Sequence, residues 1–333
     1  MKNIIVTTLA FAGLAFHATA EGLNTKQIPA NAQWIAHVDV DGFKASELGQ
    51  FTMTRLKDIA APIDAVAAML QFDPRKDLSD ITAYGQVNPD QPENGVALIR
   101  GKFNPEHLLT LLKANETFKT EKTGKHELLS WKDQKSKQQQ FGSIVNQNLL
   151  VVGSHRKLIS QALATVDGKG KTLDAQKLKD LQLDPNAYIM LGMATLEGLP
   201  IPPQAKMLEN VKSVGLTFGE RNKNLEAGVH LLAANEEFAT QIQQMLQGFL
   251  AIAQLQTGNA QDAKAKEAAQ FLKDVKIEQK NKLVRLRLAV PVDKVLEKAR
   301  MQFEAQNKKP GQEGRFKVEL GFDSEAGKDK KKD

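Results

Sequence analysis

The order of its predicted elements repeats along the chain, and this repeat limits the possible folds more than any other sequence feature. Residues 29–36 and 184–191 each carry an Asn-Ala pair after a proline, and an apolar strand follows in both. Matched elements further along are separated by about 130 residues. We therefore predict two tandem related halves that share one plan.

Each half is predicted to run in the order strand, helix, two strands, helix, two or more strands, helix. Short apolar runs joined by tight polar turns are typical of antiparallel hairpins. We expect the hairpins at 81–103, 141–152, 211–232 and 275–290, and the helices at 46–70, 106–113, 156–166, 203–208, 236–255 and 292–305. This mixture predicts an α+β fold, in which each half is a mainly antiparallel sheet with helices packed on it.

The first twenty residues are typical of a signal peptide for Sec export. Lys2 precedes an apolar run at 4–16 that is too short to span a bilayer, and Ala18-Thr19-Ala20 matches the small-x-small cleavage pattern. We expect an exported protein, periplasmic or secreted, whose mature chain begins at Glu21.

The remaining boundaries follow from composition. The first α+β half is expected at 21–166 and the second at 186–322, joined by a glycine-rich linker at 167–185 with a short helix at 175–181. The lysine-rich tail at 323–333 lacks bulky apolar residues and is predicted to be disordered.

Composition excludes several classes of function. The chain has no cysteine, so disulfides, thiol nucleophiles and Cys-ligated zinc are excluded. Its net charge of +6 is spread over 333 residues, unlike the concentrated basic face of a nucleic-acid-binding protein. No stretch after the signal peptide approaches the ~18 uninterrupted apolar residues of a transmembrane helix.

One strand carries the strongest candidate for a metal site. In a strand through residues 34–41, alternation would place His37, Asp39 and Asp41 on one face and the apolar residues on the other. An imidazole and two carboxylates can ligate a divalent metal or perform acid–base chemistry. A half-buried strand with a polar outer face explains the same pattern without any function.

No complete catalytic set is visible elsewhere. The chain has neither a G-x-S-x-G elbow nor a G-x-x-x-x-G-K-[ST] phosphate loop, so we predict no catalytic residues and no cofactor.

Two further surfaces have alternative explanations. Arg285 and Arg287 form a stripe on one strand that can meet an anionic polymer or a lipid headgroup, or can be a solvated sheet face partly neutralised by Glu278. The amphipathic helix at 236–255 can cover its own sheet or a lipid or partner groove, and its glutamine-rich polar face favours the sheet.

The segment 32–41, Ala-Gln-Trp-Ile-Ala-His-Val-Asp-Val-Asp, resembles the opening strand of uncharacterised bacterial secreted proteins with a duplicated α+β plan. The resemblance would extend over about residues 27–301 in element order, and it implies no known activity or site residues.

Three hypotheses for the function follow. The leading one is a non-enzymatic binding or scaffolding protein of the bacterial envelope, with an envelope protein or an anionic surface as partner. The first alternative is a metal-dependent hydrolase centred on His37, Asp39 and Asp41. The second is a periplasmic carrier of an apolar ligand.

Overall fold

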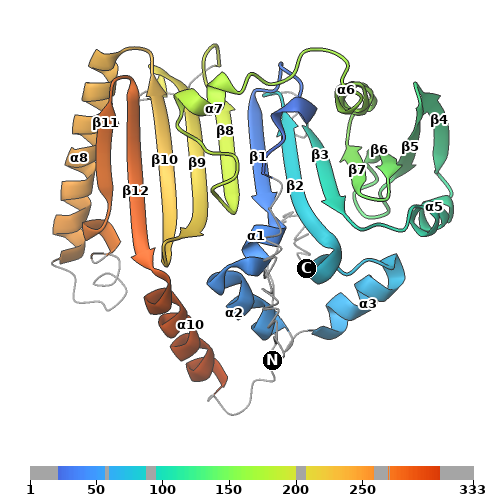
Figure 1. Cartoon of the computed structure of the whole chain (residues 1–333), viewed down its shortest axis with the longest axis horizontal. Coiled ribbons are helices and arrows are strands. Elements are labelled where there is room, and N and C mark those ends of the chain that lie inside the picture. Colours follow the sequence, from blue (N-terminus) through green and yellow to red (C-terminus); the bar gives the residue numbers. More distant parts are fainter. Residues whose placement is uncertain are drawn as a thin grey trace, which may run out of the picture.

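The computed structural model is built around one continuous twelve-stranded antiparallel sheet (Figure 1). The structure describes residues 22–56, 60–87, 95–199, 208–258, 269 and 271–307. The signal peptide, residues 203–207 of the helix predicted at 203–208 and the lysine-rich tail lie outside these residues. The sheet order is β11-β12-β10-β9-β8-β1-β2-β3-β7-β6-β5-β4, so the predicted α+β class is confirmed.

The strands are β1 (Trp34–Asp39), β2 (Leu78–Gly85), β3 (Gly95–Gly101), β4 (Lys119–Thr123), β5 (His126–Lys132), β6 (Gln139–Asn146), β7 (Leu149–Gly153), β8 (Met190–Thr195), β9 (Val211–Arg221), β10 (Asn224–Ala233), β11 (Lys276–Lys280) and β12 (Leu283–Pro291). The helices include η1 (Thr25–Gln27), α1 (Val40–Ala45), α2 (Glu47–Leu56), α3 (Ala60–Leu70), α4 (Pro74–Asp77), α5 (Pro105–Lys113), α6 (Arg156–Val166), α7 (Gln176–Asp180), α8 (Glu236–Gly258) and α10 (Val292–Asn307).

The two predicted halves meet edge to edge. Strand β1 pairs with β8 in antiparallel register from Trp34↔Ala194 to Val38↔Met190. The expectation of a separate sheet for each half is therefore wrong, because this pairing merges them. Strand order runs outward from the junction in chain order on both sides, as β1-β2-β3-β7 and as β8-β9-β10-β12. The common origin of the halves stays a prediction.

Local signals account for most elements. Asn104 Oδ1 accepts a hydrogen bond of 3.1 Å from the His107 amide and so caps α5. The β9–β10 hairpin closes through Asn222 and Lys223, which have positive φ values of 49° and 60°. This is the backbone of a two-residue primed turn, whose twist matches that of the strands. The hairpin predicted at 211–232 is therefore confirmed, with its turn at Asn222 and Lys223.

The structure differs from the predicted elements in two places. The single helix expected at 46–70 is divided: α2 ends at Leu56 and α3 begins at Ala60. Strands β4 and β5 had no predicted residue range, although the predicted order allowed more than two strands before the last helix. Strand β4 is largely exposed, with lysine and threonine residues in place of an apolar alternation, so the sequence carries no hydrophobic signal there.

The first face of the sheet, to which Ile35 points, carries the larger core. Strand residues such as Ile35, Leu98 and Val151 pack there against Ile159 of α6 and Leu181 after α7. All five are at most 2% exposed. The short helix predicted at 175–181 lies on this face as α7.

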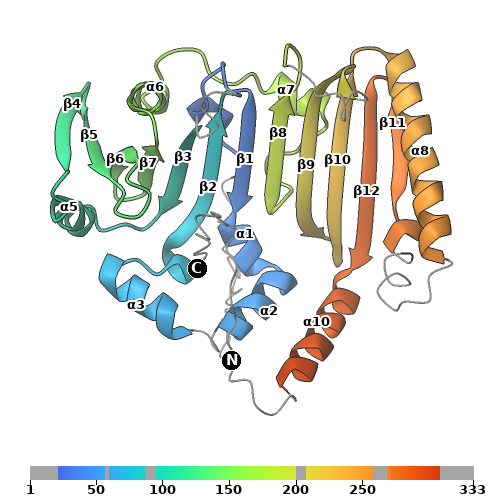
Figure 2. The same cartoon turned by 180° about the vertical axis from the view of Figure 1, so that it is seen from behind.

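The second face is covered by α8 at one end of the sheet (Figure 2). Ala239 and Ile242 of this helix contact a cluster that includes Leu231 of β10 and Val284 of β12. The prediction that this amphipathic helix packs on its own sheet is therefore confirmed for these contacts. Among the described helices, none is long and apolar enough to cross a membrane.

Substitutions at two adjacent residues of β8 test which face of this strand is buried. Leu191 is 2% exposed on the first face, whereas Met190 is 49% exposed on the second. Leu191→Ala should lower the free energy of unfolding by about 2–5 kcal/mol, because a buried cavity is created. Met190→Ala should change it by less than about 1 kcal/mol. Denaturant unfolding of both variants measures the difference, and equal losses would contradict this assignment.

Candidate functional site

The structure does not bring the predicted metal ligands together on one strand face. Strand β1 ends at Asp39, and Asp41 belongs to helix α1. His37 and Asp39 lie on the first face, where they are 1% and 8% exposed. The prediction that the polar side chains form the outer face of this strand is therefore wrong, because the face that carries Ala36 and Val38 is the more exposed one.

Each of the three residues has a separate structural role. His37 Nδ1 shares a 2.9 Å hydrogen bond with Thr82 Oγ1, whereas Asp39 Oδ1 accepts one of 2.7 Å from the Gly42 amide and caps α1. Asp41 forms an ion pair of 2.6 Å with Lys44. Among the described residues, no group of three His, Asp or Glu side chains can hold a metal ion. The metal-site hypothesis stays a prediction without an assembled ligand set.

A buried ion pair adjoins His37 and was missed in the sequence. Asp80 is 2% exposed, and its Oδ1 accepts a hydrogen bond of 2.8 Å from Arg100 Nη1. Arg100 also donates to the side chain of Gln27 at the end of η1. The pair thus ties the N-terminal segment to the sheet. A lone acid and a lone arginine 20 residues apart give no sequence signal, because only the β2–β3 pairing brings them together.

Burial and the neighbouring charge change the protonation of His37. Desolvation, and secondarily the positive charge of Arg100, lower its pKa from 6.5 to about 4. The neutral imidazole is therefore the form that the folded protein favours. Its Nε2 is buried without a hydrogen-bond partner. A histidine held neutral by its surroundings fits a structural role in the core.

An apolar groove with a volume of about 510 Å³ lies on the second face. It runs across β1, β8, β9, β10 and β12. We define the apolar groove by its side chains on this face, Ala36, Val38, Met190, Leu216, Phe218, Ala227, Val229, Leu286 and Leu288. Met190 and Leu216 are 49% and 54% exposed, which is unusual for large apolar residues in the middle of a sheet.

The groove is open because the cover on this face is incomplete. Helix α8 packs along β10, β11 and β12, whereas α1 and α2 follow the end of β1. Both views show no described helix across the middle of β8 and β9 (Figures 1 and 2). Arg287 of β12 also borders the groove. Strand alternation directs its side chain to the first face, where it pairs with Glu226 at 2.6 Å.

The low pKa of His37 predicts a pH-dependent stability. A folded-state pKa below the unfolded value favours folding above pH 6.5, and this stabilisation is lost as pH falls toward 4. The loss should reach about 3 kcal/mol in total. His37→Gln should flatten the free energy of unfolding between these pH values, and His107→Gln on α5 serves as the control. Identical pH profiles for His37→Gln and the unmodified protein would contradict the assignment.

No protein-family model and no curated protein matches the sequence, so the resemblance seen at residues 32–41 stays a prediction. Crystal structures of TP0453, a Treponema pallidum protein, are similar in chain arrangement. Crystal form III matches with a TM-score of 0.45 and 8% identity, covering 82% of this chain and 96% of that chain. Crystal form IV matches with a TM-score of 0.46 and 10% identity, covering 84% and 97%. A likeness at this level carries no argument about ligand or activity.

Proposed function

We propose that this protein is a non-catalytic binding protein of the bacterial envelope, exported through Sec, that holds the hydrocarbon chain of a lipid in the apolar groove. The proposal joins the leading hypothesis, a binding protein, with the carrier hypothesis. The observation that carries it is the groove itself. Its volume of about 510 Å³ falls in the range of small-molecule sites.

Hydrogen bonding favours a hydrocarbon chain over an extended peptide. Strands β8, β9, β10 and β12 each have a neighbour on both sides, so their backbone groups are used within the sheet. The groove side chains offer no donor or acceptor. An extended peptide lying there would leave part of its own backbone unsatisfied, at a cost of about 1–3 kcal/mol per buried group. A hydrocarbon chain has no such requirement.

Burial of apolar surface supplies the driving force for binding a hydrocarbon chain. Leu216 and Met190 expose about half of their surface, and covering apolar area contributes about 25 cal/mol per Å². The net positive charge of the chain also favours an anionic amphiphile, such as a fatty acid, over a cationic one. The metal-dependent hydrolase remains the alternative, but no arrangement of the described residues favours it.

Displacement of a fluorescent fatty acid tests the proposal. Leu216→Asp places a carboxylate inside the groove and should weaken binding at least about tenfold, because the charge must be desolvated by the hydrocarbon chain. Leu216 is half exposed, so the variant should fold with little loss of stability.

Leu255→Asp on α8 is the matched control, because Leu255 is 68% exposed and lies outside the groove. This variant should bind as the unmodified protein does. Equal weakening in both variants, or no binding by the unmodified protein, would contradict the proposed function. If Leu255→Asp alone loses binding, the apolar surface of α8 is the binding site.

A further inference from the structure

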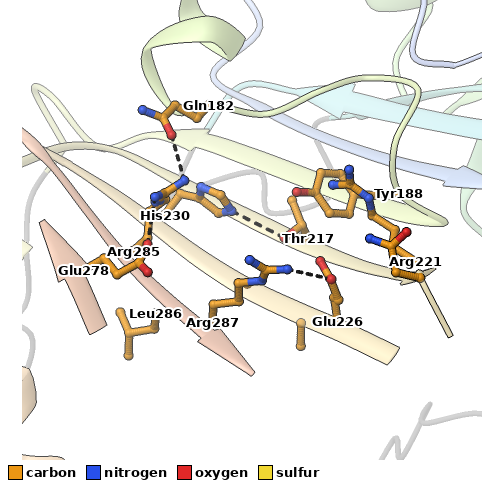
Figure 3. A pocket seen from close by; sticks show the side chains of 13 residues that line it. Gln182, Tyr188, Thr217, Arg221, Glu226, His230, Glu278, Arg285, Leu286 and Arg287 are labelled. Atoms are coloured by element: carbon orange, nitrogen blue, oxygen red, sulfur yellow. Dashed lines mark hydrogen bonds and ion pairs between the residues drawn. The ribbon is translucent and has the colours of Figure 1, made fainter. Parts of the chain in front are cut away.

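A second, polar pocket lies on the first face of the same strands (Figure 3). The groove lies on the opposite side of the sheet. The volume of the polar pocket is about 230 Å³. Strands β9, β10 and β12 form its floor, and Gln182 and Tyr188 approach from the segment before β8. Charged side chains dominate its lining: Arg221, Glu226, Glu278, Arg285 and Arg287.

Buried polar residues form the floor of this pocket. Glu226 and His230 are each 6% exposed, and Thr217 is 7% exposed. His230 Nε2 lies 3.4 Å from Thr217 Oγ1, while its Nδ1 has no partner that meets full hydrogen-bond geometry. A Cβ at Gly228 would lie 2.5 Å from Thr217 Oγ1 and 3.0 Å from His230 Nε2. Glycine at this position therefore keeps the floor open.

Two of the arginines are fixed by neighbouring side chains. Arg285 donates to Glu278 and to Gln182, both at 2.8 Å, and Arg287 donates to Glu226 at 2.6 Å. The expectation that Glu278 partly neutralises the arginine stripe is thus confirmed. Arg287 uses only Nη2 in this pair, so other donors of its guanidinium are available to a ligand.

Arg221 differs from the other two arginines. Its guanidinium lies 5.8 Å from the centre of the Tyr188 ring, and within the described part of the chain no carboxylate pairs with it. Three arginines therefore face two glutamates, which leaves one positive charge in excess in a partly enclosed site. A guanidinium fixed over an aromatic ring is well placed to receive a planar oxyanion through two parallel hydrogen bonds.

We propose that this pocket binds a small oxyanion, a carboxylate or a phosphate, with Arg221 as its principal ligand and Arg287 as the second. The modest volume restricts the ligand to a small molecule or to the terminal group of a larger one. The site is separate from the groove, because strand alternation directs the two linings to opposite faces. Binding of an oxyanion here neither requires nor excludes a lipid in the groove.

Titration calorimetry of the purified protein with succinate and with inorganic phosphate, at constant ionic strength, tests this proposal. We expect binding of at least one probe, and the stronger one identifies the oxyanion class. Arg221→Gln should weaken it at least about tenfold, the loss typical of one charge-assisted contact. The matched control is Arg156→Gln, since Arg156 forms an exposed ion pair with Glu121 in the first half. This variant should bind normally.

A second variant separates binding from folding. Glu226→Gln combined with Arg287→Gln removes both partners of the ion pair, so the buried Glu226 carboxylate is not left unpaired, and it should also weaken binding. Leu216→Asp should leave oxyanion binding unchanged, so failure of the groove proposal is distinguishable from failure of this one. Absence of binding by both probes, or equal binding by Arg221→Gln and the unmodified protein, would overturn the proposal.

Discussion

The pairing of β1 with β8 is the interaction on which the rest of the structure depends. These strands lie more than 150 positions apart in the chain, yet they exchange a ladder of backbone hydrogen bonds from Trp34↔Ala194 to Val38↔Met190. Without this ladder each half would expose an open strand edge, which is prone to pairing with other chains. With it, the strands at the two edges of the sheet, as the described residues form it, are β11 and β4. The junction also extends the second face from β10 to β1, which gives the groove its width.

Strand alternation separates the two surfaces that this sheet offers. On the first face of the central strands, His37, Thr82 and the Asp80–Arg100 pair lie under the N-terminal segment. Further along that face lies the polar pocket that we propose as an oxyanion site. On the second face, the part of β1, β8, β9, β10 and β12 that lines the groove presents apolar side chains, and α8 covers this face at one end of the sheet. One sheet can thus hold two chemically different ligands without contact between them.

Much of the fold was predictable from the sequence, because its signals are local. The hairpins β2–β3, β6–β7, β9–β10 and β11–β12, the cap at Asn104 and helices α5, α6 and α8 all follow from turn chemistry and periodicity. The site was much less predictable. Alternation in 34–39 indicates two faces but not which of them other elements cover. Asp41 was also expected in this strand, although the strand ends at Asp39, which caps a helix by accepting from the Gly42 amide.

The site features missed in the sequence all depend on distant pairing. Asp80 and Arg100 meet only through the β2–β3 register, and the groove requires five strands from both halves. The arginine stripe was visible in the sequence, but its enclosure by Tyr188, His230 and Glu226 was not. Such sites have no short motif, because each contributing strand supplies only one or two side chains.

Methyl NMR spectra of the protein labelled at its methionine ε-carbons, recorded during a fatty-acid titration, test the central claim most directly. Met190 lies in the apolar groove, whereas Met193 of the same strand is 3% exposed on the first face and Met301 is exposed on α10. The account predicts a saturable shift of the Met190 methyl signal, with Met193 and Met301 nearly unchanged. Shifts confined to Met301, or no shift of Met190, would contradict it.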